Sequence, residues 1–180
     1  MRRLPSVAAA LFAGLLSFAL ASAVGCGGDK KADQGDASAS AEGTPAAASG
    51  SFIDPYITIQ ETLADDSVDK LAELGAQVVA GTEAIQDKPG VAEVLAGAGR
   101  IASQDIETAR VAFEKMSMGL IAYLKANPDA RDGYQVIHCT MAFNNKGAYW
   151  VQRGGEINNP YHGKMMLRCG DPIDWDKAPG

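Results

Sequence analysis

The sequence is poor in the residues and motifs from which most active sites are built. Its 180 residues include only three cysteines, two histidines and two tryptophans. It has no Cys-x-x-Cys pair, serine-nucleophile motif, glycine-rich phosphate loop or paired-carboxylate pattern, which argues against the common thiol-redox, hydrolase and phosphotransfer arrangements. We therefore predict that the protein is not an enzyme.

Positive charge is also scarce. The chain has 16 basic and 22 acidic side chains, a net charge of −6 at pH 7. Two of the arginines lie in the first 25 residues, a segment expected to be removed, which leaves 14 basic against 22 acidic residues. Because such an acidic chain has little affinity for a phosphate backbone, no nucleic-acid partner is expected.

Residues 1–25 predict a secretory signal peptide. They hold two arginines, no acidic residue and an apolar run from Val7 to Ala23, which at roughly 17 residues makes a poor membrane span. Ala21-Ser22-Ala23 fits an ordinary cleavage site, whereas Ala23-Val24-Gly25-Cys26 resembles a bacterial lipobox. We favour the lipobox, in which Cys26 is acylated and becomes the mature N-terminus.

Residues 26–50 form a Gly/Ala/Ser-rich segment without an apolar pattern that could bury surface. This composition predicts a disordered tether. Signal, lipidation site and tether together predict a protein in the periplasm or cell envelope that is lipid-anchored to a membrane. A secreted soluble protein is the alternative.

Residues 51–180 predict a globular domain with two unlike parts. Residues 51–127 are rich in Ala, Leu, Val and Glu at helical spacing, whereas residues 134–173 hold both histidines and the two remaining cysteines. The predicted fold is mainly α. It is a helical bundle of about four helices with a small C-terminal β-containing, loop-rich cap.

Four helices are expected. The first spans 54–63, the second carries Val68 to Ile85 and ends before Pro89, the third spans 91–102, and the fourth begins directly after residue 103 and ends at Asn127-Pro128. Polar residues 65–67 are expected to stop the first helix and cap the second, and Ser103 is expected to cap the fourth.

The fourth helix carries a stripe of apolar residues, and Met116 on this stripe is interpreted as core packing rather than as a ligand. Charged side chains of the helices, such as Arg110, are interpreted as solvated.

A strand is expected from Tyr134 to Phe143, where β-branched and aromatic residues dominate. Strand alternation places Cys139 and Met141 on one face and His138 on the other. Further along, Met166 and Cys169 share a side in a helical or turn conformation but not in an extended one.

Residues between 147 and 162 also receive an interpretation. Trp150 is predicted to be a core anchor, and Gly147 to permit a tight turn. Asn158-Asn159-Pro160 is a turn signal, with Tyr161 expected to pack under it. His162 is as consistent with exposure as with metal ligation.

The sulfur residues support two hypotheses. Cys139 with Met141 and Met166 with Cys169 would suit Cu(I) or Ag(I), which prefer thiolate and thioether donors, and His138 or His162 could complete the shell. Zinc fits less well, because methionine is a poor ligand for it. Alternatively, Cys139 and Cys169 form a disulfide in an oxidising compartment.

Four blocks of this sequence resemble a known exported bacterial family. The blocks 138–143, 145–150, 157–163 and 166–170 occur in the order and spacing of domain of unknown function 3347, and the resemblance covers Ile53 to Ile173. Members of that family occur as lipoproteins or periplasmic proteins, and fused to membrane-fusion adaptor subunits of copper and silver efflux pumps.

The resemblance implies a heavy-metal role and a ligand set. The family's His-Cys-Pro-Met-Ala block falls on residues 138–142, and its Met-Leu-Thr-Cys-Gly block falls on residues 166–170. This sequence departs from the family pattern at Thr140, Tyr149 and Arg168, which replace proline, aspartate and threonine.

We therefore predict an exported, lipid-anchored binding protein for Cu(I) or Ag(I) in envelope metal homeostasis or efflux. Its predicted metal ligands are Cys139, Met141, Met166, Cys169 and His138. The alternative is a non-catalytic structural or interaction domain, stapled by a disulfide between Cys139 and Cys169. Such a domain would dock on an efflux-pump adaptor or another envelope protein.

Overall fold

The computed structural model describes residues 51–180. The predicted signal peptide (1–25), the lipidation site Cys26 and the tether (26–50) lie outside the described residues. The helices are α1 (Ile53–Ala64), α2 (Leu71–Gly81), α3 (Val91–Ala98), α4 (Ile106–Ala126) and α5 (Ala142–Asn145). The strands are β1 (Tyr134–Cys139), β2 (Ala148–Arg153) and β3 (Asp171–Ile173). The short 3-10 helices are η1 (Glu83–Ile85), η2 (Pro128–Arg131), η3 (Gly163–Met166) and η4 (Trp175–Lys177).

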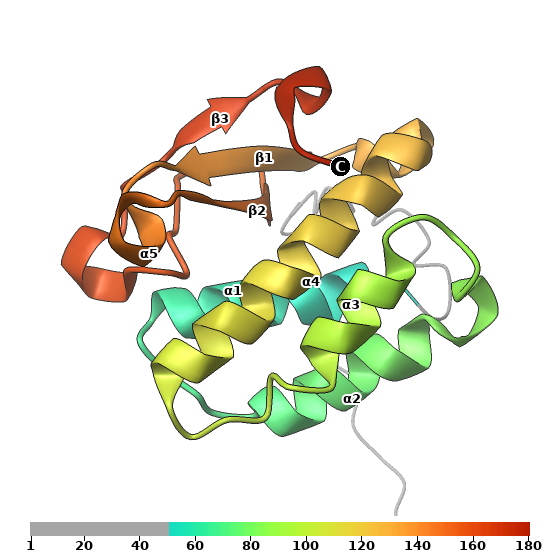
Figure 1. The fold of residues 1–180 in the computed structure, drawn as a ribbon, viewed down its shortest axis with the longest axis horizontal. Coiled ribbons are helices and arrows are strands. Elements are labelled where there is room, and N and C mark those ends of the chain that lie inside the picture. Colours follow the sequence, from blue (N-terminus) through green and yellow to red (C-terminus); the bar gives the residue numbers. More distant parts are fainter. Residues whose placement is uncertain (1–50) are drawn as a thin grey trace, which may run out of the picture. The chain divides into compact units, whose positions relative to one another are not determined.

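The prediction of a mainly helical fold with strands at the C-terminal end is confirmed. The three strands form one antiparallel sheet in the order β2-β1-β3, so that β1 is central. In Figure 1 the sheet lies on one side of the long helix α4, and α2 and α3 lie on the other. Helix α4 contacts both α3 and β2 and therefore connects the helical part to the sheet.

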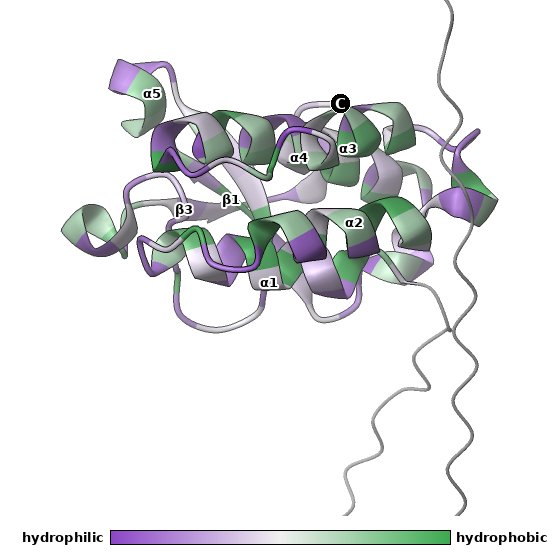
Figure 2. Cartoon of the chain, turned by 90° about the horizontal axis from the view of Figure 1, so that it is seen from below, coloured by the Kyte–Doolittle hydropathy of each residue, from purple (hydrophilic) through white to green (hydrophobic). Residues whose placement is uncertain are grey.

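The helices with the clearest apolar spacing lie where they were predicted. Helix α1 buries Tyr56, Ile59 and Leu63 completely, and Met116 is a core residue of α4, as expected. Along α1 to α4, hydrophobic and hydrophilic residues share each helix, as they do in helices that bury one face (Figure 2). No helix of residues 51–180 is both long enough and apolar enough to cross a bilayer.

The cap of α4 is not the predicted one. Asp105 is the N-cap residue, and its carboxylate accepts a hydrogen bond from the backbone N–H of Thr108 at 2.9 Å. The Ser103 hydroxyl instead accepts a bond from the backbone N–H of Asp105. Both residues are common at helix starts, but only the side chain of Asp105 reaches the free amides of the first turn.

The predicted start of the second helix is wrong. Helix α2 begins at Leu71 instead of residue 68, because Asp66 (φ 58°) and Lys70 (φ 59°) adopt left-handed conformations that no α-helix contains. The Ser67 hydroxyl accepts a bond from the backbone N–H of Asp69 and so stabilises the turn rather than the helix. Helix α3 ends at Ala98, four residues before the predicted end.

Trp150 anchors the core under the sheet, as predicted. Its side chain is fully buried, contacts the Tyr161 ring edge-on at 5.8 Å and donates a hydrogen bond to Gln152. Hydroxyl groups join the sheet to the helices: the Tyr56 and Ser117 side chains are hydrogen-bonded at 2.7 Å, and the Tyr56 oxygen accepts a bond from the Val151 backbone N–H. These bonds fix β2 against α1 and α4.

Candidate functional site

The two cysteine-bearing blocks meet at one end of the sheet. Cys139 is the last residue of β1 and is fully buried, and the half-buried Cys169 lies two residues before β3. Because β3 pairs with β1 so that Asp171 lies opposite His138, residues 30 positions apart in the sequence come together. The two Sγ atoms are 2.9 Å apart, and both side chains are free thiols.

The environment of Cys169 favours the protonated thiol. Burial raises the pKa of the Cys169 thiol to about 11, and the neighbouring Cys139 and the Asp171 carboxylate act in the same direction. Reactive and catalytic cysteines show the opposite shift, because a nearby cation or helix N-terminus stabilises their thiolate. The Cys169 thiol therefore lacks the lowered pKa that is typical of a nucleophilic cysteine.

We expect Cys169 in the reduced, folded protein to react slowly with iodoacetamide at pH 8 and faster as the pH approaches 11. A rise of its pKa from 9.0 to about 11 lowers its thiolate fraction at pH 8 about 100-fold. Mass spectrometry of tryptic peptides would give the rate. The matched control is the protein unfolded in guanidinium chloride, and an equal rate at pH 8 in both states would contradict the expectation.

Met141 does not share a strand face with Cys139, so this prediction is wrong. The strand ends at Cys139, and Phe143, Asn144 and Asn145 form a left-handed turn with φ between 50° and 65°. The turn is closed by a backbone bond from Asn145 N–H to the Met141 carbonyl. It leaves Met141 47% exposed beside the fully buried Cys139. Asparagine adopts this left-handed conformation at a lower energetic cost than most residues, which favours the turn.

Met166 lies in a turn that brings it toward Cys169. It is the last residue of η3, and the Cys169 backbone N–H donates a hydrogen bond to the Met166 carbonyl at 3.0 Å. This is the turn conformation for which the sequence predicts that the two side chains share a side. Met166 is half-buried, whereas its neighbour Met165 is 79% exposed.

The two histidines are not brought to the cysteine pair. His138 stacks on Tyr149, its partner across the strands, with ring centroids 4.1 Å apart. His162 is half-buried, and its Nε2 atom is buried without a hydrogen-bond partner. Between residues 51 and 180, no three His, Cys, Asp or Glu side chains form a group that could hold a metal ion.

Asn159 holds the cysteine-bearing loop and was not recognised in the sequence beyond its turn signal. It is fully buried, and its side-chain amide donates a hydrogen bond to the Cys169 carbonyl at 2.7 Å. Its side-chain oxygen accepts bonds from the backbone N–H groups of Tyr161 and His162. Tyr161 is buried, as predicted, and its hydroxyl donates to the Tyr149 carbonyl at 2.7 Å. Asn159, which the sequence predicts only as part of a turn, thus holds the backbone of Cys169 beside that of Tyr161 and His162.

Arg110 is buried, so its assignment to a solvated helix face is wrong. It is 6% exposed and forms ion pairs with Asp66 and Glu107. Hydrogen bonds from the Lys164 backbone and from Arg110 hold the pKa of Asp66 below its usual range. The sequence does carry a signal for this burial: Arg110 lies four residues after Ile106 and three before Phe113, on the apolar side of α4.

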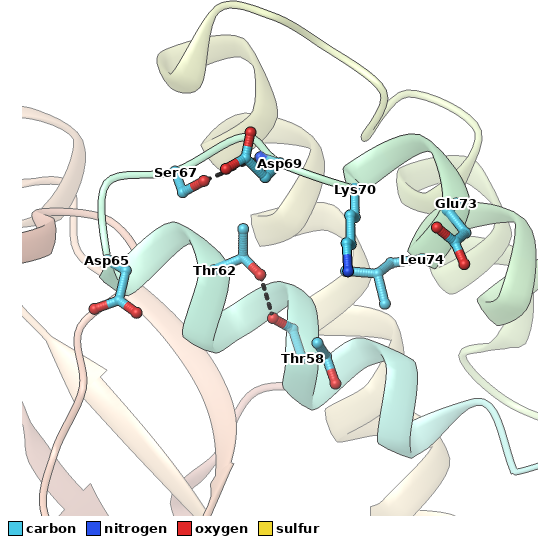
Figure 3. A pocket seen from close by; sticks show the side chains of 8 residues that line it. All are labelled: Thr58, Thr62, Asp65, Ser67, Asp69, Lys70, Glu73 and Leu74. Carbon is cyan, nitrogen blue, oxygen red and sulfur yellow. Dashed lines mark hydrogen bonds between the residues drawn. The ribbon is translucent and has the colours of Figure 1, made fainter.

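One hollow on the surface is separate from the sulfur residues. It lies between α1 and the start of α2 and has a volume of about 400 Å³ (Figure 3). The Thr62 hydroxyl donates to the Thr58 carbonyl, and the Thr58 hydroxyl to that of Asp54. The hollow is lined by Thr58, Thr62, Asp65, Ser67, Asp69, Lys70, Glu73 and Leu74. Because it contains no cysteine, methionine or histidine, it adds nothing to the predicted metal site.

Comparisons of the chain with protein-family models, with curated proteins and with solved structures give no match. The resemblance to domain of unknown function 3347 and the functions that it implies therefore remain predictions. The geometry of the cysteine pair and its neighbours provides the independent basis for a functional proposal.

Proposed function

We propose that the protein is an exported, lipid-anchored binding protein for Cu(I) or Ag(I) that serves envelope metal homeostasis or efflux. The observation that carries this proposal is the close approach of the Cys139 and Cys169 thiols, 2.9 Å apart at the end of the sheet. In this proposal a helical bundle supports a small sulfur-rich cap, and the protein carries out no catalysis.

The donor types match a soft monovalent cation. Two thiolates from Cys139 and Cys169 are the principal ligands, and the Met166 thioether, one turn before Cys169, is the third. Met141, exposed at the neighbouring turn, would contact an incoming ion first. His138 is left out of this revised set, because within residues 51–180 its ring does not form a three-residue ligand group with the two cysteines. The Arg168 charge is offset by an ion pair with Glu156.

Metal binding must change both the protonation and the spacing of the pair. The raised pKa of Cys169 means that a metal has to displace its proton at neutral pH, so affinity should increase with pH. Metal–thiolate bonds are about 2.3 Å long, and two sulfurs that share one ion lie further apart than 2.9 Å. Binding therefore requires the cap to widen slightly.

A second candidate function rests on the same short distance. Two cysteines this close in an oxidising compartment can form a disulfide, and the full burial of Cys139 suits a structural bond. Closing a loop of about 30 residues would stabilise the domain by roughly 3 to 4 kcal/mol in the chain-entropy model. The protein would then be a stapled interaction domain that docks on an efflux adaptor or another envelope protein.

Native mass spectrometry separates the two functions. The protein is purified without reductant from a copper-supplemented periplasm, and the mass of the folded species is measured. One bound copper, lost on replacement of Cys139 and Cys169 with serine, would support the metal proposal. A mass lighter by two hydrogens, without an adduct, would favour the disulfide-stapled domain and overturn metal binding as the main function.

We expect Met166→Leu to lower the Cu(I) affinity of the reduced protein about tenfold, because it removes a thioether donor. The substitution nearly conserves volume and should cost less than about 1.5 kcal/mol of stability. Competition with a chromogenic Cu(I) chelator measures the affinity, and thermal unfolding measures the stability.

The matched control for this prediction is Met116→Leu, which makes the same chemical change in the core of α4. It should leave the Cu(I) affinity unchanged. Equal affinities of the wild-type protein and the Met166→Leu variant would remove Met166 from the ligand set.

A further inference from the structure

The side chain of Arg110 joins four separate parts of the chain. Its Nε donates to the Pro160 carbonyl at 2.9 Å, and one terminal nitrogen donates to Asp66 at 2.7 Å and to the Leu63 carbonyl at 3.4 Å. The other terminal nitrogen bonds Glu107 at 2.8 Å. An arginine that is only 7% exposed thus ties the end of α1, the turn after it and α4 to the loop that follows β2.

That loop rests directly on the Arg110–Asp66 pair. The second carboxylate oxygen of Asp66 accepts a hydrogen bond from the Lys164 backbone N–H at 2.9 Å. Gly163 (φ +56°) lies so close to the pair that a Cβ atom there would fall 1.8 Å from Asp66 Oδ1 and 2.8 Å from an Arg110 nitrogen. Only glycine permits this approach. The loop is thus hydrogen-bonded to the pair at Pro160 and Lys164 and packs closely against it at Gly163.

A continuous chain of hydrogen bonds leads from this contact to Cys169. The Gly163 backbone N–H donates to the Asn159 carbonyl at 3.1 Å, and the Asn159 side chain donates to the Cys169 carbonyl at 2.7 Å. Leu167, two residues before Cys169, accepts a bond from the Asn159 backbone N–H at 2.8 Å. A shift of the loop at Gly163 would therefore be passed to Cys169.

We infer that Arg110, held by Asp66, is a positioning residue that fixes the loop of residues 159–169 on the helices and so keeps the Cys169 thiol beside that of Cys139. This inference deepens the proposed function, because it names residues that control the same cysteine pair. It applies equally to the thiol pair and to a disulfide formed from it.

A purely structural ion pair would behave differently from a positioning one. Loss of a structural pair lowers the free energy of unfolding but leaves the proximity of the two thiols in the folded state unchanged. Loss of a positioning pair also lowers the tendency of the thiols to join. This tendency is measured by the equilibrium in which the protein dithiol and glutathione disulfide yield the protein disulfide and two molecules of glutathione.

The test compares three variants of the purified protein in glutathione redox buffers. Asp66→Asn removes the charge that holds Arg110, and Gly163→Ala pushes the loop off the pair without removing a charge. The control is Asp54→Asn, the same substitution in an exposed ion pair between α1 and Arg153 of β2. The oxidised fraction is read by mass spectrometry after acid quenching and alkylation, and near-UV circular dichroism confirms that each variant is folded.

We expect Asp66→Asn and Gly163→Ala to lower the equilibrium constant for disulfide formation about tenfold, within the range of coupling between residues of one network. Asp54→Asn should change it less than about twofold, as expected for an exposed pair. Reduced stability with an unchanged constant in Asp66→Asn would overturn the inference, and this variant decides the question if Gly163→Ala does not fold.

The two proposals can fail separately. The glutathione equilibrium needs no metal, so a wild-type protein that does not bind Cu(I) would refute the proposed function and leave this inference intact. Conversely, suppose that the wild-type protein binds Cu(I) but that Asp66→Asn and Gly163→Ala leave the equilibrium constant for disulfide formation unchanged. That result would refute this inference alone.

Discussion

Replacing Cys169 with serine is expected to lower the Cu(I) affinity of the reduced protein more than about 100-fold. Loss of a residue that only hydrogen-bonds to a metal ligand already lowers metal affinity by up to about 100-fold, and the loss of a ligand itself should cost more. Serine keeps the size of the side chain but offers a hard, protonated oxygen to a cation that prefers thiolate. Cys169 is the better position for this test than Cys139, because Cys139 is fully buried and a hydroxyl there would also destabilise the fold.

The double variant Cys139→Ser/Cys169→Ser provides the sharpest control. If the two thiolates bind one ion as a unit, the second substitution adds little to the first, so single and double variants should have similar residual affinity. Competition with a Cu(I) chelator at several pH values measures all three proteins. A Cys169→Ser variant that binds Cu(I) as the wild-type protein does would contradict the proposed site.

The expected pH dependence gives a second readout of the same site. Each thiol proton displaced by the metal makes the apparent affinity rise about tenfold per pH unit below the pKa of that thiol. The pKa of Cys169, about 11, places this rise across the whole neutral range. The Cys169→Ser variant has one thiol fewer to deprotonate, so its residual binding should depend less steeply on pH.

The sequence is sufficient to place the helices whose apolar residues recur at regular helical spacing. Helix α1 and helix α4 carry apolar residues at helical spacing and lie within one or two residues of the predicted bounds. The start of α2 was missed because tertiary contacts decide it. Asp66 is held in a left-handed conformation by its bonds to Arg110 and Lys164, and neither partner is close to it in the sequence.

The sulfur site was predictable only in part. The family resemblance directed attention to the blocks around Cys139 and Cys169, and the structure brings these two thiols together. The exposed position of Met141 was not predictable from strand propensity, because the aromatic and β-branched residues continue past the true end of β1. The turn residues Asn144, Asn145 and Gly147 come only after Phe143, so they do not mark the end of the strand at Cys139.

The role of Asn159 shows what periodicity and motifs cannot reveal. Its position before Pro160 reads as a turn, which is correct, and two of its side-chain hydrogen bonds come from the nearby backbone of Tyr161 and His162. The third is donated to the Cys169 carbonyl, ten residues further along the chain. A fully buried polar side chain in a loop is satisfied by whatever backbone surrounds it, and that environment exists only in the folded state.

Asn159→Ala is therefore expected to destabilise the protein by about 3 kcal/mol or more, because it leaves buried groups of Cys169, Tyr161 and His162 without partners at about 1 to 3 kcal/mol each. Urea unfolding of the reduced protein measures the loss. The matched control is Asn127→Ala, which removes a single side-chain hydrogen bond to the Tyr123 carbonyl and should cost about 1 kcal/mol. Equal losses in the two variants would mean that Asn159 does not clamp the loop, and the path from Arg110 to Cys169 would then be broken at its last step.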